Sequence, residues 1–213
     1  MTASVIAFST QMGSGGNGIA RAVAERLRFR FYDWEIFSRA AAEAGVSAEV
    51  LAVATSQRSP GFMERMMARL AALGAGEEPA VSSPAVPRLS TMTSDDYRQF
   101  LEHVVHELGT QGDAVIVNHN CQVLLRDLPG VLKVLVVGSD ERRAARLARI
   151  QGVSPNAARI TVLDSDRQRA DFLKRVYHFD WLSMANYDIA LNTDRVASDL
   201  AVDIVTAAAK EMP

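Results

Sequence analysis

Two hydrophobic patterns alternate along this chain. Short runs made almost entirely of hydrophobic residues are typical of strands that are buried on both faces of a parallel sheet. Longer stretches, in which hydrophobic residues recur every three or four positions, are typical of helices with one buried face. The runs predict strands at residues 4–8, 29–33, 113–118, 131–137 and 187–191, and the periodic stretches predict helices at 19–28, 34–44, 62–73, 94–109, 122–127, 140–150 and 196–209.

The alternation of strands and helices predicts an α/β fold with a parallel sheet of about five strands. Right-handed crossovers place helices on both faces of such a sheet, and ligands bind beyond the carboxyl ends of its strands. At this edge the sequence places a glycine-rich turn, Asp33, residues 118–120 and the segment after Gly138. We therefore expect these polar groups to lie close together.

Residues 45–95 interrupt this alternation. In the predicted helix 62–73, Met63, Met66 and Met67 form an apolar stripe, which indicates a packing or dimer surface rather than a membrane-surface helix. Residues 74–91 then hold three prolines among small residues. This composition predicts a loop or a linker.

Composition and charge narrow the class of protein. The chain has 213 residues, 48% of them hydrophobic, and a formal net charge of −2. This suits one α/β domain over residues 1–213 and excludes a disordered chain or a generally basic nucleic-acid binder. No apolar run is long enough to span a membrane, and the N-terminus lacks a secretory-signal pattern. The one cysteine, Cys121, excludes an intramolecular disulfide framework, so we expect a cytoplasmic protein.

The glycine-rich turn is the first candidate site. A helix that starts after such a turn offers unpaired N–H groups and the positive end of its dipole to phosphate. The P-loop pattern G-x-x-x-x-G-K-[ST] is incomplete, because Gly16 stands at the lysine position and Asn17 at the hydroxyl position. Gly13, Gly15 and Gly18 match the dinucleotide pattern G-x-G-x-x-G. The pattern alone leaves a phosphate-binding loop and a plain tight turn both open.

The charges are distributed unevenly. Residues 139–178 hold nine Arg or Lys and five Asp or Glu, a charge of +4, so the rest of the chain carries −6. This asymmetry favours a local anion site. Within the segment, Arg142, Arg143, Arg146 and Arg149 are expected to lie on a solvated helix face.

Other candidate groups favour structural roles. His103 and His106 are spaced i, i+3 on a predicted helix, but no Cys or His cluster accompanies them, so we expect half-exposed helix residues rather than zinc ligands. Cys121 follows His119 by two residues. A single cysteine without a supporting arrangement is expected to be inert.

Three blocks of sequence carry a family resemblance. STQMGSGGNGIARAVAERLRFRFYDWEIF opens the chain, VIVNHNCQVLLRDLPGVLKVLVVGSDERRAARL lies in its centre, and DRQRADFLKRVYHFDW with NYDIALNT follows. Their residues and order resemble the cytidylate-kinase-like proteins, relatives of bacterial cytidylate kinase whose P-loop lacks the usual lysine. The resemblance implies a P-loop NTPase-like three-layer sandwich with a helical monophosphate-binding insert at residues 34–95 and a lid at residues 152–182.

The resemblance also implies a reaction, in which ATP with Mg²⁺ phosphorylates a cytidylate-type acceptor, CMP or dCMP. It places Asp33, Arg39 and His119 at the acceptor, with Asp33 organising the magnesium–water shell or the acceptor. The implied catalytic residues are Arg169, Lys174 and Arg175 with Asp33, and Arg169 would reach the transferring phosphoryl group. The implied ATP-binding residues are Gly13, Ser14, Gly15, Gly16, Asn17, Gly18, Asn192 and Thr193, and Ser14 would also assist Mg²⁺.

Three positions depart from the family pattern. Thr10 and Gln11 stand where the family has an arginine–glutamate pair, and His119 stands where it has an arginine between two glycines. Fixed charges near the phosphates are therefore missing. This predicts, as an alternative, a catalytically weakened nucleotide-binding or regulatory protein. A homodimeric interaction module built on the methionine-rich segment is a third possibility.

Overall fold

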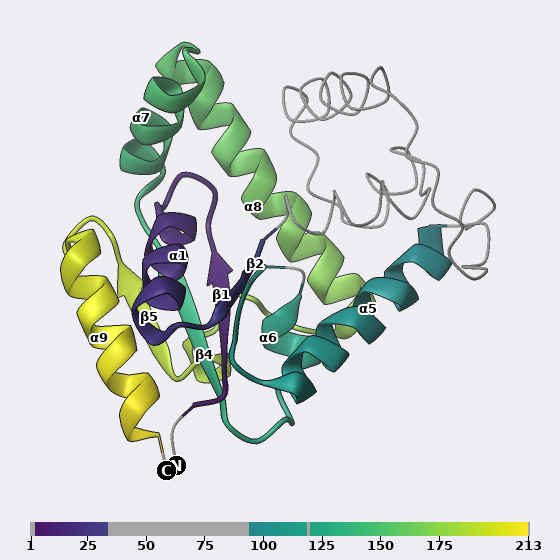
Figure 1. Cartoon of the computed structure of the whole chain (residues 1–213). Helices are drawn as coiled ribbons and strands as arrows, with labels where there is room; N and C mark the ends of the chain where they lie inside the picture. The colour runs from purple at the N-terminus through teal and green to yellow at the C-terminus, as the bar shows by residue number, and fades with distance from the viewer. Residues whose placement is uncertain (1–2, 34–93, 119, 213) are drawn as a thin grey trace, which may run out of the picture.

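The computed structural model describes residues 3–33, 94–118 and 120–212 of the chain (Figure 1). The strands are β1 Val5–Thr10, β2 Arg30–Tyr32, β3 Ala114–Val117, β4 Val131–Val137 and β5 Ile189–Asn192. The helices are α1 Gly16–Leu27, α5 Ser94–Gln111, α6 Cys121–Leu124, α7 Asp140–Gln151, α8 Pro155–Tyr177, the 3₁₀ turn η2 Met184–Asn186, and α9 Ser198–Glu211.

The five strands form one parallel sheet in the order β2-β3-β1-β4-β5. The strand β1 lies in the centre, where Val5 is paired with Ala114 on one side and with Val131 on the other. Every residue of β1 and β3 is buried, as expected for central strands of a parallel sheet. The predicted parallel α/β sheet of about five strands is therefore confirmed.

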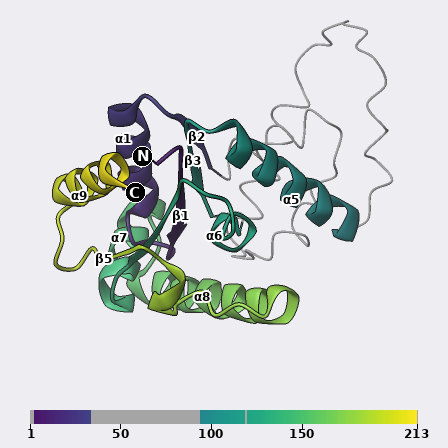
Figure 2. The same cartoon turned by 90° about the horizontal axis from the view of Figure 1, so that it is seen from below.

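Helices cover both faces of the sheet, which makes three layers (Figures 1 and 2). Side chains of β1 alternate between the two cores. Ile6 and Phe8 pack in the core that includes residues of α1 and α9, whereas Val5 and Ala7 pack in the core that includes residues of α5 and α6. The predicted three-layer sandwich is confirmed.

Helices α7 and α8 form a hairpin that begins at the carboxyl end of β4 (Figure 1). Ser139 and Ser154 cap the two helices, each by accepting a hydrogen bond from the third residue of its helix. The buried residues that join the two helices are Ala144, Leu147, Ala158 and Val162. Most of the segment predicted as a lid, residues 152–182, is the long helix α8, which contacts the carboxyl edge of the sheet.

Some boundaries differ from the sequence-based predictions. The helix predicted at 122–127 is the shorter α6, and α5 continues to Gln111, where Gly112 follows with a φ of 71°. The helices predicted at 34–44 and 62–73 and the proline-rich segment lie outside the described residues, so the insert and the methionine-rich dimer surface stay predictions. None of the helices in the described ranges is long and apolar enough to cross a membrane.

Candidate functional site

The glycine-rich loop joins the end of β1 to the start of α1 at the carboxyl edge of the sheet. Gly13 and Gly15 have φ angles of 77° and 84°, in the left-handed region that disfavours a side chain. A Cβ on Gly13 would lie 2.5 Å from the carbonyl oxygen of Arg143, and a Cβ on Gly16 would lie 2.5 Å from Cγ2 of Thr10. Glycine therefore lets the loop pack directly against α7 and β1.

Part of the backbone of this loop is open to a ligand. The Ser14 N–H points into the loop and donates a hydrogen bond to the carbonyl oxygen of Gln11 at 3.1 Å. Within the part of the chain that the structure describes, the N–H groups of Gly13, Gly15 and Asn17 make no backbone hydrogen bond. No non-neighbouring atom of the described residues lies within 4 Å of a Cβ built on Gly15 or Gly18. Free amides beside open space at a helix N-terminus are suited to bind an anion.

Arg146 of α7 contacts the loop from the opposite side. Its Nη1 donates to the carbonyl oxygens of Gly13 and Ser14, both at 3.2 Å, and to Oγ1 of Thr193 at 3.1 Å. Its Nη2 donates to the Thr193 carbonyl at 2.9 Å. Thr193 Oγ1 in turn donates to the Ser14 carbonyl at 2.8 Å. The end of β5 and the glycine loop, both predicted for ATP, are thus brought together.

Arg143 connects the loop to the predicted lid. Its side chain is only 3% exposed and forms an ion pair with Asp166 of α8, with Nη2 to Oδ2 at 2.7 Å. The same guanidinium donates to the carbonyls of Met12 at 3.1 Å and Gly138 at 2.9 Å. Burial raises the pKa of the Asp166 carboxyl, and the charge of Arg143 opposes that shift.

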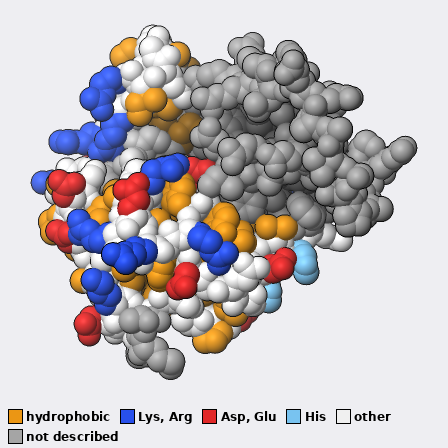
Figure 3. Space-filling model, in the orientation of Figure 1, with side chains coloured by type: hydrophobic (Ala, Val, Ile, Leu, Met, Phe, Trp, Pro, Cys, Tyr) orange, Lys and Arg blue, Asp and Glu red, His pale blue; other side chains and the backbone are white. Residues whose placement is uncertain are grey.

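The surroundings of α7 correct one expectation. The four arginines of α7 were predicted to lie on a solvated face. This prediction is confirmed for Arg142 and Arg149, which are exposed, and is wrong for Arg143 and Arg146, which donate hydrogen bonds to the loop. Figure 3 shows Lys and Arg side chains gathered at the upper left of the face, over the region of α7 in Figure 1. Arg143 and Arg146 instead lie beside the buried apolar stripe of the helix, and this i, i+3 spacing was the signal available in the sequence.

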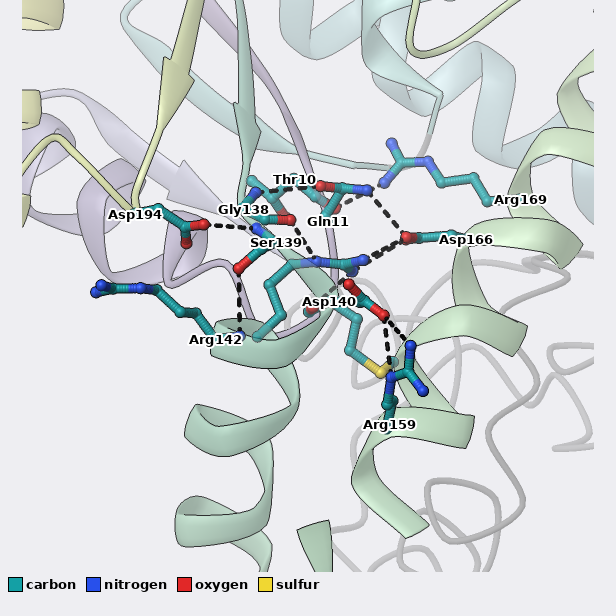
Figure 4. A network of polar contacts seen from close by, with 12 residues as sticks. Thr10, Gln11, Gly138, Ser139, Asp140, Arg142, Arg159, Asp166, Arg169 and Asp194 are labelled. Carbon is teal, nitrogen blue, oxygen red and sulfur yellow. Dashed lines mark hydrogen bonds and ion pairs between the residues drawn. The ribbon is translucent and has the colours of Figure 1, made fainter. Parts of the chain in front are cut away.

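Gln11 is a second connection between the loop and α8 (Figure 4). Its Nε2 donates to Asp166 Oδ2 at 2.9 Å, and its Oε1 accepts from the Gly138 N–H at 3.2 Å. A neutral amide therefore joins the ends of β1 and β4 to a carboxylate on the long helix. The departure from the family pattern at Gln11 has a structural use that the sequence did not reveal.

Arg169 is buried at the meeting point of α8, β1 and β3, with 7% of its surface exposed. Its Nη1 donates to the Thr10 carbonyl at 2.9 Å and to Asn118 Oδ1 at 2.8 Å, and its Nη2 donates to Ser9 Oγ at 2.9 Å. The guanidinium lies over the ring of Trp181, 4.4 Å from its centroid. Burial lowers the pKa of Arg169, but an arginine stays charged at neutral pH. The lid arginine named from the sequence thus reaches the loop-bearing strand.

Thr10 shares the partner Asn118 with Arg169, and its own N–H and hydroxyl form hydrogen bonds with uncharged side chains. Its N–H donates to Asn118 Oδ1 at 3.0 Å, and its hydroxyl donates to Asn17 Oδ1 at 3.2 Å. Asn118 therefore joins β3 to β1, and Asn17 joins the first turn of α1 to the strand before it. The side chains that replace the family's charged pair close the loop without adding charge.

Asp33 lies just beyond β2, on the far side of the loop from β5, and is 7% exposed. Arg21 of α1 donates to its Oδ2 from Nη2 at 3.2 Å, and the Arg21 guanidinium lies 4.3 Å from the centroid of the Phe31 ring. Arg21 was not among the candidates from the sequence, because a cation on the polar face of α1 has no distinctive pattern. Arg39 and His119 lie outside the described residues.

The remaining candidates are more dispersed. Lys174 and Arg175 are exposed in the last turn of α8, and the described structure gives them no hydrogen bond to the loop. Asn192 Oδ1 accepts a hydrogen bond from the Asp194 N–H at 2.9 Å. The Ser139 N–H donates to Asp194 Oδ2 at 3.0 Å, and hydrogen bonding by Ser139 lowers the pKa of the Asp194 carboxyl.

Three other groups were expected to have structural roles. His103 and His106 are exposed on α5, and the described residues hold no group of three His, Cys, Asp or Glu that could bind a metal ion. Cys121 is fully buried, and burial raises the pKa of its thiol to about 12. A protonated, buried thiol is a poor nucleophile.

Comparisons with known proteins identify a family and a fold. The sequence matches the cytidylate kinase-like family over residues 5–195, and no curated protein matches it. An uncharacterized protein from Eubacterium ventriosum is similar in structure, with a TM-score of 0.64 at 17% identity over 98% of this chain and 99% of that one. Shikimate kinase from Bacteroides thetaiotaomicron has a TM-score of 0.51 at 14% identity over 95% of this chain and 96% of the other. These structures share the fold.

Proposed function

The chain belongs to the cytidylate kinase-like family, and we propose that it is a nucleotide kinase that transfers the γ-phosphoryl group of ATP to a nucleoside monophosphate. A cytidylate, CMP or dCMP, is the acceptor that the family name suggests. The observation that supports this most is the glycine loop at the start of α1, where the N–H groups of Gly13, Gly15 and Asn17 make no backbone hydrogen bond within the described residues and the space beside Gly15 is open. A polyphosphate needs such a group of donors.

Mg²⁺ neutralises charge on the phosphates in reactions of this class. Ser14 is 1% exposed and its Oγ accepts from the Gly16 N–H, so it does not present a free oxygen to an ion. The described residues also hold no cluster of acidic or His and Cys side chains for a metal. Mg²⁺ in such sites is held by one or two protein groups together with phosphate oxygens and water, so we propose that the ion arrives bound to the phosphates of ATP.

On the acceptor side, the proposal assigns Asp33 to orient the monophosphate, with Arg39 and His119 as further contacts. Asp33 is buried at the end of β2 and held by Arg21 at 3.2 Å. A fixed carboxylate at this edge can orient a hydroxyl, an amino group or a water molecule of the acceptor. The acceptor phosphate oxygen then attacks the γ-phosphorus as the bond to the leaving ADP breaks.

Arg169 supplies positive charge to the transferring phosphoryl group in this proposal. The hydrogen-bond acceptors on its two Nη atoms are neutral: the Thr10 carbonyl, Asn118 Oδ1 and Ser9 Oγ. Its charge is therefore not cancelled by a direct ion pair with any described carboxylate. A fixed charge in a site closed from water stabilises a transition state more than a mobile, hydrated one. Lys174 and Arg175 are proposed as outer cations of the same helix.

A second candidate function is nucleotide binding with little turnover. The uncharged network of Thr10 and Gln11 favours it, because both side chains are engaged with other parts of the protein and offer no charge to phosphate. Such a protein would bind ATP at the same loop and have a regulatory role rather than a catalytic one.

A turnover panel separates the two functions. Release of ADP is measured in a coupled assay with ATP and a set of ribo- and deoxyribonucleoside monophosphates, with Mg²⁺ and with Mn²⁺, on the full chain. The kinase predicts turnover that depends on the acceptor, strongest with CMP or dCMP. Nucleotide binding without turnover for any acceptor would select the binding protein, and absence of both would contradict the two proposals together.

A further inference from the structure

We propose that Arg146, supported by Arg143, is a positioning residue that shapes the glycine loop for phosphate where the loop has no lysine. This inference rests on the proposed function, since it concerns the same phosphate site. A P-loop lysine contacts phosphate directly. Arg146 instead contacts the loop backbone and acts on the ligand through it.

Three successive carbonyls of the loop point toward α7. The carbonyl oxygens of Met12, Gly13 and Ser14 accept hydrogen bonds from guanidinium groups of α7 at 3.1, 3.2 and 3.2 Å. In a planar trans peptide the C=O and the following N–H point in opposite directions. Drawing three successive carbonyls toward α7 therefore turns the N–H groups of residues 13, 14 and 15 away from it. Since the Ser14 N–H is used inside the loop, those of Gly13 and Gly15 are left for a ligand.

Arg146 also brings a positive charge to the loop. Its acceptors are neutral, namely two loop carbonyls and the hydroxyl and carbonyl of Thr193. Arg143, by contrast, is paired with Asp166. Of the two arginines on the loop, Arg146 is therefore the one whose charge is not cancelled by a direct ion pair with a described carboxylate. It places positive charge behind the amides and increases their attraction for an anion.

The planar guanidinium of Arg146 also fixes the loop geometry. Arg146 reaches Gly13, Ser14 and Thr193 at once, from two nitrogens of one rigid plane. A lysine ammonium at the same position keeps the charge but not the planar geometry of donors. The Arg146→Lys variant therefore separates the effect of charge from the effect of positioning.

The test uses the full chain in three variants: Arg146→Ala, Arg146→Lys and, as control, Arg149→Ala. Arg149 lies one turn further on the same helix and is exposed, so the control removes the same charge without touching the loop. Two quantities are measured. The first is the amide NMR signals of Gly13 and Gly15 in the ligand-free protein, and the second is the affinity for inorganic tripolyphosphate by calorimetry.

We expect Arg146→Ala to shift or broaden the two glycine signals and to weaken tripolyphosphate binding about tenfold or more. Arg146→Lys should recover less than half of the lost binding free energy, and Arg149→Ala should stay within about twofold of the wild type. If Arg146→Ala does not fold, the same comparison is made between Arg146→Lys and the control.

Unchanged Gly13 and Gly15 signals in the Arg146 variants would overturn the inference, whether or not the protein binds ATP. Losses equal to those of Arg149→Ala would also overturn it, because they would reflect net charge alone. A wild type that does not bind tripolyphosphate contradicts the proposed function instead. In that case the NMR comparison in ligand-free protein still decides whether Arg146 positions the loop.

Discussion

Gly13 and Gly18 belong to the same glycine-rich segment, but their surroundings differ. Gly13 has a φ of 77° and a Cβ there would lie 2.5 Å from the backbone of α7, whereas a Cβ on Gly18 would meet open space. We expect Gly13→Ala to lower the free energy of unfolding by about 2–4 kcal/mol, through backbone strain and a contact that cannot relax. Gly18→Ala should leave it unchanged or raise it by up to about 1 kcal/mol, since alanine favours a helix.

Urea denaturation of both variants, followed by tryptophan fluorescence, measures the two effects. Equal stabilities for Gly13→Ala and Gly18→Ala would mean that the loop does not pack against α7 as described. Comparison of the two variants also shows which glycine of the G-x-G-x-x-G pattern is needed for packing, which the pattern itself does not indicate.

Arg169 combines a structural position with a proposed chemical one. Its guanidinium is buried and engaged with three neutral acceptors, so lysine at this position keeps the charge but loses most of the hydrogen bonds. We expect Arg169→Lys to lower kcat about 100-fold and to change the affinity for a non-hydrolysable ATP analogue by less than about threefold. Steady-state kinetics and calorimetry give the two numbers. Equal losses in turnover and in ATP binding would contradict a role at the transferring phosphoryl group.

At the scale of elements, the sequence was a good guide to the sheet and a poor one to helix contacts. The strands β1, β3 and β4 are short apolar runs that can be recognised from their own residues, and β4 was predicted at its observed bounds, Val131–Val137. The inward turn of Arg143 and Arg146 depends on where the loop after β1 lies, more than 120 residues earlier. The i, i+3 spacing places the two arginines on one face of the helix, but no local pattern shows what that face contacts. The same applies to the pairing of Asp166 with Arg143.

The pairing of α7 with α8 can be tested at Asp166. Removal of its charge leaves the Arg143 side chain, 3% exposed, without its ion-pair partner. We expect Asp166→Asn to lower the free energy of unfolding by about 3 kcal/mol, the cost of a buried cation left alone. The matched control is Asp164→Asn, whose ion pair with Arg167 joins side chains that are 41% and 70% exposed.

The control should change the free energy of unfolding by less than about 0.5 kcal/mol, because exposed ion pairs contribute little. Chemical denaturation of both variants at pH 7 supplies the comparison. A loss at Asp166 no larger than at Asp164 would mean that the long helix is held by its apolar contacts alone.

At the scale of the whole molecule, the candidate site was predictable as a place but not as a set of contacts. Parallel strands bring their carboxyl ends to one edge, so the loop, Asp33, residues 118–120 and the segment after Gly138 were expected together. The structure adds that α8 reaches that edge through Arg169 and Asp166. The ends of β1, β3, β4 and β5 and the helices α1, α7 and α8 are therefore connected to the loop by hydrogen bonds.

This convergence predicts that nucleotide binding stabilises the described domain as a unit. A ligand that binds only the folded state at 100 times its dissociation constant adds about 2.7 kcal/mol to the free energy of unfolding. We expect ATP with Mg²⁺ to raise the melting temperature of the wild type with increasing concentration, and adenosine to raise it much less, because the loop binds phosphate. For Gly13→Ala, the rise in melting temperature caused by ATP, relative to the ligand-free variant, should be much smaller than for the wild type. A melting temperature that does not respond to ATP would show that the amides at the start of α1 hold no polyphosphate, and both proposed functions would then fail for the same reason.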